Sequence, residues 1–365
     1  MKKAADYIAV SAFFIIVIMF AAYTLVFGRL GNGDDISDKK DIRHNTQCYV
    51  SENFPLSSNW RSLRTTVFVM TGKKNFDDIY ILNNRLVETA EHDTDRLEKN
   101  ISQLNDFSEN TDTPVYVMLA PTAAGVYSAK LPAYAEKTDQ REMIDNIYYD
   151  LDSKIETIDT FYPMYSARSN YVYYRTDRKW TSFGAYFAYA DGIKELGFEP
   201  VALSNYDQEY TSDSYYGGLY SELCYNRIGA DRVNIFRSKY KTTVDSVEIY
   251  RGDQVLTSNS VYFRSALKTS DKTAIFLQGD NFTKATVKTT VEDAPKLLII
   301  KGSYANTLVP FLTPHYSEIT LVDPDKLKEE GKTLSDVADT SGYDQILFMY
   351  DCDQFADETN FDLLK

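Results

Sequence analysis

The sequence predicts an α/β fold in which helices cover a mostly parallel β-sheet. Short apolar segments rich in β-branched residues alternate with longer amphipathic segments, which is the pattern of strands connected by crossover helices. The clearest such unit runs from residue 296 to residue 312 and reads KLLIIKGSYANTLVPFL. Its apolar residues 297–300 predict a buried strand, and residues 304–312 predict a helix that stops near Pro314.

Other segments extend the same alternation along the chain. Leu97, Ile101 and Leu104 recur at helical spacing, and VYVMLA and QILFMY are uninterrupted apolar runs typical of central strands. The expected helices are residues 54–70, 94–107, 138–151 and 184–196, and the expected strands are residues 115–120, 160–164, 274–277, 286–290, 319–322 and 345–350. We also expect a hairpin at 77–87, a small antiparallel insertion at 247–256 and 261–264, and long loops at 205–235.

The amino-terminal segment predicts a membrane anchor. Residues 7–28 contain no charged residue, and as a helix they would span about 30 Å of hydrocarbon. A cleavable signal peptide is the alternative, although no small-x-small site follows the apolar stretch. We therefore divide the chain into a cytoplasmic stub with a signal anchor (1–29), a polar tether (30–48) and one domain (49–365), which we place outside the cytoplasm of a bacterium.

The composition describes a folded, acidic protein. The 44% of hydrophobic and 14% of aromatic residues are typical of a packed chain. A net charge of −14 argues against binding of nucleic acid through its phosphates. Cys48, Cys224 and Cys352 are far apart and leave one disulfide open, and no Cys or His cluster has metal-ligand spacing, so we expect no metal or cofactor.

Ser303 is the first candidate for chemistry. It follows a strand and precedes a helix, where unpaired backbone N–H groups and the helix dipole favour developing negative charge. Nucleophilic serines of α/β hydrolases and of SGNH-type esterases use this position. The simpler alternative is that Ser303 only caps its helix.

Two stretches resemble the bacterial DHHW family, which is named for an Asp-His-His-Trp motif. The first is YYRTDRKWT at 173–181, followed by Gly184-Ala185-Tyr186, and the second is LLIIKGSYANTLVPFLTPHYSEITLVD at 297–323. Shorter similarities are FPLSSNW at 54–60, APTAAGVY at 120–127, LPAYAEKTDQ at 131–140 and YGGLYSE at 216–222. Together they cover most of the chain from about residue 52.

The resemblance implies a fold and a function. The DHHW family is similar to SGNH hydrolase-like proteins that O-acetylate alginate and other exopolysaccharides, so it implies a three-layer α/β/α domain. It implies Asp177 as the orienting carboxylate, position 179 as the base and Ser303 as the nucleophile of an acyl-serine mechanism. It also implies an envelope polysaccharide and a membrane-bound O-acyltransferase as partners.

The chain departs from this pattern at the two histidines, which are replaced by Arg178 and Lys179. Lysine has a reference pKa of about 10.4 and cannot accept a proton while it is charged. A neighbouring Asp177 would favour the charged form, so we expect Lys179 and Asp177 to form an ion pair. No other histidine is a convincing substitute: His44 lies in the tether, His92 is expected to be solvated at the start of a helix, and His315 is expected to be a structural residue.

Several further residues are weaker candidates for substrate or oxyanion contacts. Asp280 and Asn281 follow a predicted strand, Gly302 and Asn306 flank Ser303, and Arg178 and Trp180 lie in the motif. For Asp280 and Asn281 the alternative is a polar turn, for Asn306 a solvent-facing side chain, and for Trp180, Tyr173 and Tyr174 a place in the core.

Two functions compete on this evidence. The chain is either a catalytically degenerate DHHW protein that binds a glycan or acts as a scaffold in O-acetylation, or an active O-acetyltransferase or acetylesterase that uses Ser303. The missing histidines favour the first function, whereas Ser303 and Asp177 favour the second.

Overall fold

The computed structural model describes residues 56–364, except 77, 136–137 and 240–243, together with residues 11, 14, 15, 18, 19 and 22. The predicted tether, Cys48, His44 and most of the predicted anchor therefore lie outside the described residues. Among the residues that are described, none of the helices is both long and apolar enough to cross a membrane.

The chain divides into two compact units, which are considered separately. The first comprises residues 1–73 and 223–226, and the second comprises residues 74–222 and 227–365. In the first unit, the helix predicted at residues 54–70 is confirmed as α3 (Ser57–Met70). Its buried Thr65 donates a hydrogen bond of 2.8 Å to the carbonyl of Leu223.

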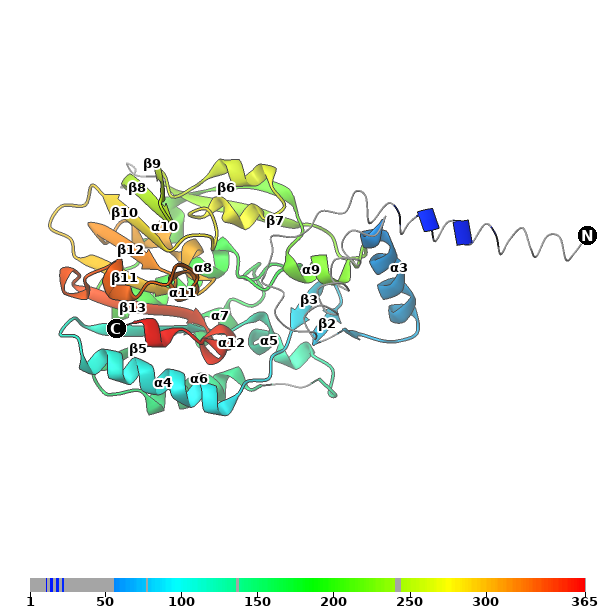
Figure 1. The fold of residues 1–365 in the computed structure, drawn as a ribbon, viewed down its shortest axis with the longest axis horizontal. Coiled ribbons are helices and arrows are strands. Elements are labelled where there is room, and N and C mark those ends of the chain that lie inside the picture. Colours follow the sequence, from blue (N-terminus) through cyan, green and yellow to red (C-terminus); the bar gives the residue numbers. More distant parts are fainter. Residues whose placement is uncertain are drawn as a thin grey trace, which may run out of the picture. The chain divides into compact units, whose positions relative to one another are not determined.

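An eight-stranded sheet forms the centre of the second unit (Figure 1). Its strand order is β5-β4-β13-β11-β12-β10-β8-β9, in which the pairs from β5 to β12 are parallel and the pairs from β12 to β9 are antiparallel. The strands are β4 (Val115–Ala120), β5 (Ile155–Asp159), β8 (Val244–Arg251), β9 (Gln254–Ser258), β10 (Lys284–Thr289), β11 (Lys296–Lys301), β12 (Glu318–Val322) and β13 (Gln345–Asp351). The predicted mixed α/β architecture with a mostly parallel sheet is confirmed.

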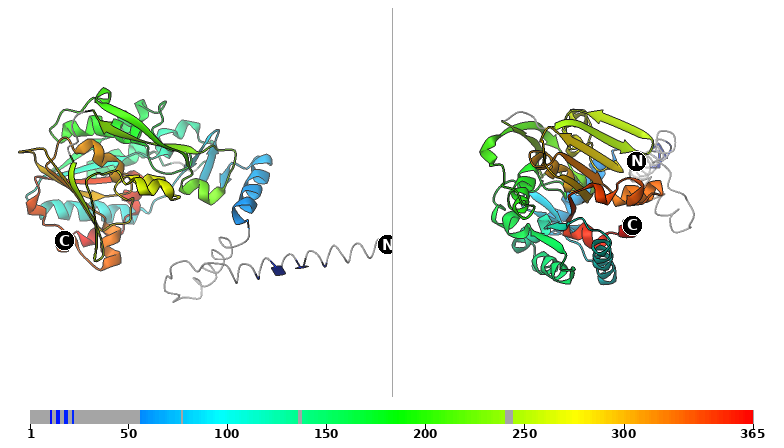
Figure 2. Two further views of the ribbon diagram at one scale, coloured as in Figure 1. Left: turned by 90° about the horizontal axis from the view of Figure 1, so that it is seen from above. Right: turned by 90° about the vertical axis from the view of Figure 1, so that its left-hand side faces the viewer.

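Helices cover both faces of this sheet because its central strands are apolar on both sides. Leu297 and Ile299 of β11 join one buried cluster with α8 and α10, whereas Leu298 and Ile300 join a second cluster with α4, α6 and α12. Figure 2 shows these layers from two further sides. The helices are α4 (Thr94–Glu109), α5 (Ala123–Val126), α6 (Gln140–Asp150), α7 (Phe161–Ser166), α8 (Ser182–Glu195), α9 (Gly218–Leu223), α10 (Ala305–Leu312), α11 (Pro324–Glu330) and α12 (Cys352–Asp357).

The predicted hairpin is present as β2 (Ile79–Leu82) and β3 (Arg85–Glu88), with β1 (Asn75–Phe76) alongside. Asn83 has a φ of 46° at its turn. This left-handed conformation is one that asparagine tolerates better than most residues.

Three sequence predictions of local structure are wrong. Residues 205–235 are not only loops, because β6 (Tyr206–Tyr215) and β7 (Asp231–Ser238) form an antiparallel ribbon. The strand expected at 160–164 ends earlier, at Asp159, whose carboxylate accepts a hydrogen bond of 2.8 Å from the amide of Phe161 at the start of α7. Residues 261–264 and 274–277 form one isolated bridge, Tyr262 to Phe276, beside short 3₁₀ turns, since Leu277 has a φ of 49° that an extended strand does not allow.

Candidate active site

Ser303 stands just beyond the carboxyl end of β11, as the sequence predicts. The amide of Gly302 donates to the carbonyl of Met349 on β13 (2.8 Å), and α10 begins two residues after Ser303. A Cβ atom at position 302 would lie 2.7 Å from the Oε1 atom of Gln354 and 2.9 Å from the ring of Tyr350. Glycine is therefore required for this close approach of the turn to β13.

The Ser303 turn opens into a charged cavity of about 480 Å³. Its walls come from residues at or after the carboxyl ends of β11, β12 and β13, where ligands of open α/β sheets usually bind, and from Asp280, which precedes the antiparallel strand β10. They include the side chains of Asp280, Lys301, Asp323, Lys326 and Gln354.

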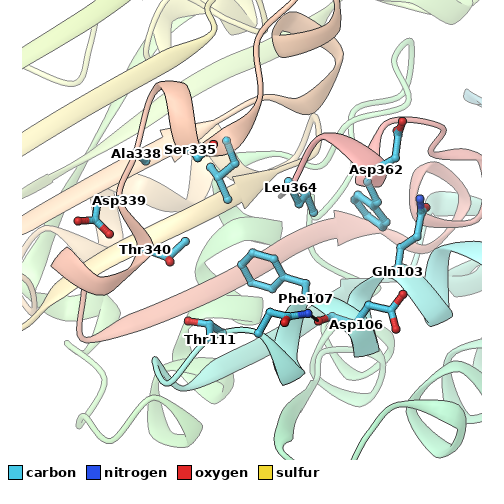
Figure 3. A pocket seen from close by; sticks show the side chains of 13 residues that line it. Gln103, Asp106, Phe107, Thr111, Ser335, Ala338, Asp339, Thr340, Asp362 and Leu364 are labelled. Carbon is cyan, nitrogen blue, oxygen red and sulfur yellow. Dashed lines mark hydrogen bonds between the residues drawn. The ribbon is translucent and has the colours of Figure 1, made fainter.

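A larger cavity of about 840 Å³ lies elsewhere, between the end of α4 and the last residues of the chain (Figure 3). Asn110 and Thr111 on its wall precede β4, and Thr340 precedes β13, so this cavity is at the amino ends of the parallel strands. None of the predicted site residues lines it. Of these two cavities, the one at Ser303 is lined by residues that the sequence predicts for the site, among them Asp280 and Ser303.

The segment 177–180 is tied to the Ser303 turn through Tyr304. The hydroxyl of Tyr304 donates to the carbonyl of Arg178 (2.6 Å), and the indole N–H of Trp180 donates to the carbonyl of Tyr304 (3.0 Å). The two rings pack with their centroids 4.9 Å apart. Two stretches that are far apart in sequence therefore meet at one place.

Asp177 supports the turn that carries position 179. Its Oδ1 atom accepts from the amide of Lys179 (2.9 Å), and its Oδ2 atom accepts from the hydroxyl of Tyr215 (2.7 Å) and the amide of Gly218 (2.8 Å). A Cβ atom at position 217 would lie 2.1 Å from Oδ2, so Gly217 leaves the space that the carboxylate occupies. Asp177 is buried and is held by two backbone amides and one tyrosine hydroxyl rather than by a side chain at position 179.

Comparison with known proteins identifies the family. The DHHW family model matches residues 64–322, which is more than half of the chain. The chain belongs to the DHHW family. The sequence-based assignment to this family is therefore confirmed.

Solved structures with TM-scores above 0.6 share the fold, and another matches less closely. A DHHW family protein from Eubacterium siraeum DSM 15702 is similar with a TM-score of 0.61 and 22% identity, over 78% of this chain and 96% of the other. Bacillus cereus PatB1, solved with a sulfonyl adduct, gives a TM-score of 0.66 and 16% identity, over 79% of this chain and 98% of the other. The O-acetyltransferase domain of Pseudomonas putida AlgJ gives a TM-score of 0.46 and 13% identity, over 79% and 95%. No curated protein matches the sequence.

Lys179 occupies a position where the DHHW motif has histidine, and its partner differs from the predicted one. The expected ion pair with Asp177 is wrong: the ammonium lies 2.5 Å from the Oδ2 atom of Asp280. Burial lowers the pKa of Lys179, but attraction and hydrogen bonding to Asp280 and the charge of Asp177 outweigh it and raise the pKa above its usual value. Lys179 is held in its charged form and has no free electron pair for a proton.

Lys301 completes a buried charge network that the sequence did not reveal. Its ammonium lies 3.1 Å from Asp280 and 2.9 Å from Asp323, and its side chain is 1% exposed. Burial lowers the pKa of Lys301, but these two carboxylates outweigh it and raise the pKa. The same two lysines hold the pKa of Asp280 below its usual range, against the opposing effect of burial. Two cations and two carboxylates therefore compensate one another beside Ser303.

The candidate oxyanion donors are already engaged. The amide of Ser303 donates to Gln354 Oε1 (2.8 Å), and the side-chain amide of Asn306 donates to the carbonyl of Gly279 (2.9 Å) and to Asp280 (3.2 Å). Gly302 uses its amide in the contact with β13, and Asn281 is exposed. A substrate oxygen would have to displace one of these acceptors.

Two motif residues do not face the cavity. Trp180 is fully buried, so its ring has no face for a sugar, and the same holds for Tyr173 and Tyr174. Arg178 extends to the carboxylates of Glu88 and Glu222, with 2.9 Å to the latter. Its guanidinium is thus committed to ion pairs.

Asp351 is a site residue that the sequence reasoning missed. It ends β13 and caps α12 by accepting a hydrogen bond of 2.9 Å from the amide of Gln354. Burial, followed by the charge of Asp353, raises the pKa of Asp351 to about 7, and a hydrogen bond from the Ser303 side chain opposes that rise. The rule that placed Ser303 also applies here, because Asp351 follows the predicted strand 345–350 directly.

The two described histidines, His92 and His315, are engaged with other partners. His92 is not solvated as predicted: its ring is 7% exposed, with 3.0 Å from Nε2 to Asp353 and 3.5 Å from Nδ1 to Asp357. The structural role expected for His315 is confirmed, since its Nε2 atom lies 2.8 Å from the hydroxyl of Tyr189 and burial lowers its pKa to about 4.

Proposed function

We propose that this DHHW protein is a membrane-anchored, extracytoplasmic component of cell-envelope polysaccharide O-acetylation that binds the glycan without using the histidine relay of its family. One observation carries this proposal, namely the ion pair between Lys179 and Asp280. A lysine held in its charged form cannot accept the serine proton that a neutral histidine would accept.

Engagement of the oxyanion donors supports the same proposal. Stabilisation of a developing oxyanion requires N–H groups that point at an open position. Here the amides of Gly302 and Ser303 and the side chain of Asn306 all donate within the protein. The site therefore differs from a relay-driven acyl-transfer site at more than the base.

The cavity at Ser303 has the chemistry of a glycan-binding site. Its wall carries the ammonium of Lys326, the side-chain amides of Gln354 and Asn360, the hydroxyl of Thr359 and the carboxylate of Asp325. Asn360 donates to Asp325, Thr359 donates to Asn360 and Lys326 donates to Glu329, so these groups would exchange a bond within the wall for one to a sugar. Sugar hydroxyl groups both donate and accept, so such a mixed lining suits them. We place an envelope polysaccharide there, and we expect a membrane-bound O-acyltransferase to be the partner that supplies acetyl groups.

A second candidate is an active O-acetyltransferase or acetylesterase, and the position of Asp351 favours it. Asp351 ends β13 next to the end of β11, and interaction with the Ser303 side chain favours the charged form of this carboxylate. A carboxylate in that place would take the hydroxyl proton while the serine oxygen attacks the acetyl carbonyl of a donor ester; the ester C–O bond then breaks, and the donor leaves as an alcohol that carries away that proton. The acyl-serine would then pass its acetyl group to a sugar hydroxyl or to water.

Turnover and binding distinguish the two candidates. The full chain in detergent is assayed with p-nitrophenyl acetate, and its retention on immobilised alginate is measured, for wild type, Ser303→Ala and Asp351→Asn. We expect retention on alginate in all three proteins and no Ser303-dependent turnover. Turnover that rises with pH near neutrality and is lost in both variants would establish the second candidate, whereas the absence of retention in wild type would overturn the proposal.

A further inference from the structure

A separate cavity of about 550 Å³ lies against the β6–β7 ribbon. Its lining includes Arg175, Tyr210, Asp213, Arg232 and Asn234, and it shares no residue with the cavity at Ser303. Arg175 belongs to the motif stretch 173–181, but none of these side chains takes part in the network around Ser303. The ribbon itself is visible at the upper edge of Figure 1.

Two guanidinium groups face this cavity without acidic partners. Neither Arg175 nor Arg232 forms an ion pair with another residue in the described part of the chain. The carboxylate of Asp231 accepts instead from the amides of Arg175 and Thr176, at 2.8 to 3.0 Å, and from two hydroxyl groups. Glu209 is likewise occupied by two other arginines, so the charges of Arg175 and Arg232 remain available to a ligand.

Asn234 is the second observation that points to a ligand. It is 1% exposed and lines the cavity, and its side-chain N–H₂ group is buried without a hydrogen-bond partner among the described residues. Its backbone is fixed, because it pairs with Tyr210 across the ribbon and its carbonyl accepts from Ser182 (2.6 Å). A buried donor left unpaired costs roughly 1–3 kcal/mol, and an oxygen of a bound ligand removes that cost.

Aromatic rings border the same cationic cavity. The hydroxyl of Tyr171 donates to Asp231, which fixes its ring, and the guanidinium of Arg175 lies 5.3 Å from the centre of that ring. Tyr210 is 64% exposed and also lines the cavity. Aromatic faces pack against the apolar C–H face of a sugar, and guanidinium groups bind carboxylates through paired hydrogen bonds.

We propose that this cavity binds an acidic sugar unit, with its carboxylate at Arg175 and Arg232, one of its oxygens at the side-chain amide of Asn234 and its ring beside Tyr210. The proposal rests on the proposed glycan-binding function and deepens it by naming the chemistry of the glycan as a polymer with carboxylated sugars. Two arginines against the single carboxylate of Asp213 make the lining locally cationic on a chain with a net charge of −14. This lining therefore attracts an acidic polymer locally, against the net charge of the chain.

The test is isothermal titration calorimetry on the full chain in detergent, with tri-galacturonate as the acidic probe, maltotriose as the neutral one and inorganic phosphate as a simple anion. We expect tri-galacturonate to bind and the other two not to bind. Arg232→Ala should weaken binding about tenfold, the loss of one charge-assisted contact. Asp213→Asn should strengthen it about threefold, because a like charge is removed from the lining.

Arg237→Ala is the matched control. Arg237 lies on the same strand as Arg232 and is exposed, but it pairs with Glu209 and does not line the cavity. The inference would be overturned if Arg232→Ala and Arg237→Ala weakened binding equally, or if tri-galacturonate did not bind. It would also be overturned if maltotriose or phosphate bound as tightly as tri-galacturonate. Retention of wild type on alginate in those cases would leave the proposed function intact, whereas loss of that retention would remove both.

Discussion

Returning histidine to position 179 tests whether the replacement of this one residue is enough to explain a loss of catalytic activity. In Lys179→His, an imidazole would replace the ammonium that pairs with Asp280, and Asp280 would keep its contact with Lys301. General acid–base catalysis is typically worth about 10²–10⁴-fold, so a site that lacked only its base would gain turnover of that size. The structure predicts a much smaller gain.

The reason lies in the groups around Ser303. Loss of one oxyanion donor typically costs about 10²–10³-fold, and the Ser303 amide is held by Gln354 at 2.8 Å. Asp177 already accepts three hydrogen bonds, from the backbone amides of Lys179 and Gly218 and from the hydroxyl of Tyr215, so an imidazole would share this carboxylate with three other donors. We expect Lys179→His alone to raise turnover less than about tenfold, and Lys179→His combined with Gln354→Ala to exceed it by a further ~10-fold or more.

The assay is hydrolysis of p-nitrophenyl acetate by the full chain, from acidic to alkaline pH. Each variant is paired with the same variant carrying Ser303→Ala, and only the difference counts as Ser303-dependent turnover. Labelling of Ser303 by an aryl sulfonyl fluoride, measured by intact mass, gives a second readout of nucleophile activation. A gain of about 100-fold or more in Lys179→His alone would refute the reasoning, because the oxyanion donors would then not be limiting.

Three further predictions concern the folded state. Burial and the charge of Asp353 raise the pKa of Asp351 from 3.8 to about 7, so the stability of wild type falls as pH rises from about 4 to about 7. Asp351→Asn, which does not titrate, should therefore gain stability relative to wild type over that range and keep the gain above it, as measured by urea unfolding. Lys301→Met should lower the free energy of unfolding by about 3–5 kcal/mol, because it leaves Asp323 and Asp280 facing each other without their buried cation. Lys179→Met removes a partly exposed ion pair and should lower it by about 1 kcal/mol or less, as measured by the same unfolding curves. Trp180→Ala should lower the free energy of unfolding by about 3–5 kcal/mol in the same experiment. Because the ring is buried, retention of the folded fraction on alginate should not change, and loss of retention by a folded protein would contradict this.

Much of the fold followed from local patterns. The apolar run 297–300 predicted a strand buried on both faces, and β11 has that property because its residues alternate between two cores. The β6–β7 ribbon was missed for a related reason. The side chains of β6 are mostly half-exposed or exposed, whereas β7 buries four residues in succession, Val233–Phe236, so neither strand shows the apolar alternation that marks a sheet covering a core.

By itself, the sequence determined the family, the α/β class and the position of Ser303 at a strand end, because these depend on segments that are contiguous in the chain. It also revealed that the family's histidine is absent. Only the tertiary structure decided which carboxylate pairs with Lys179, since Asp177 is two residues away but Asp280, which is 101 residues away, receives the ammonium. Likewise, Gln354 and Asp351 meet the Ser303 turn because β13 lies beside β11 in the sheet. Pairing of charges and hydrogen bonds in a site depends on which strands are neighbours, and strand order is a property of the whole fold rather than of any one segment.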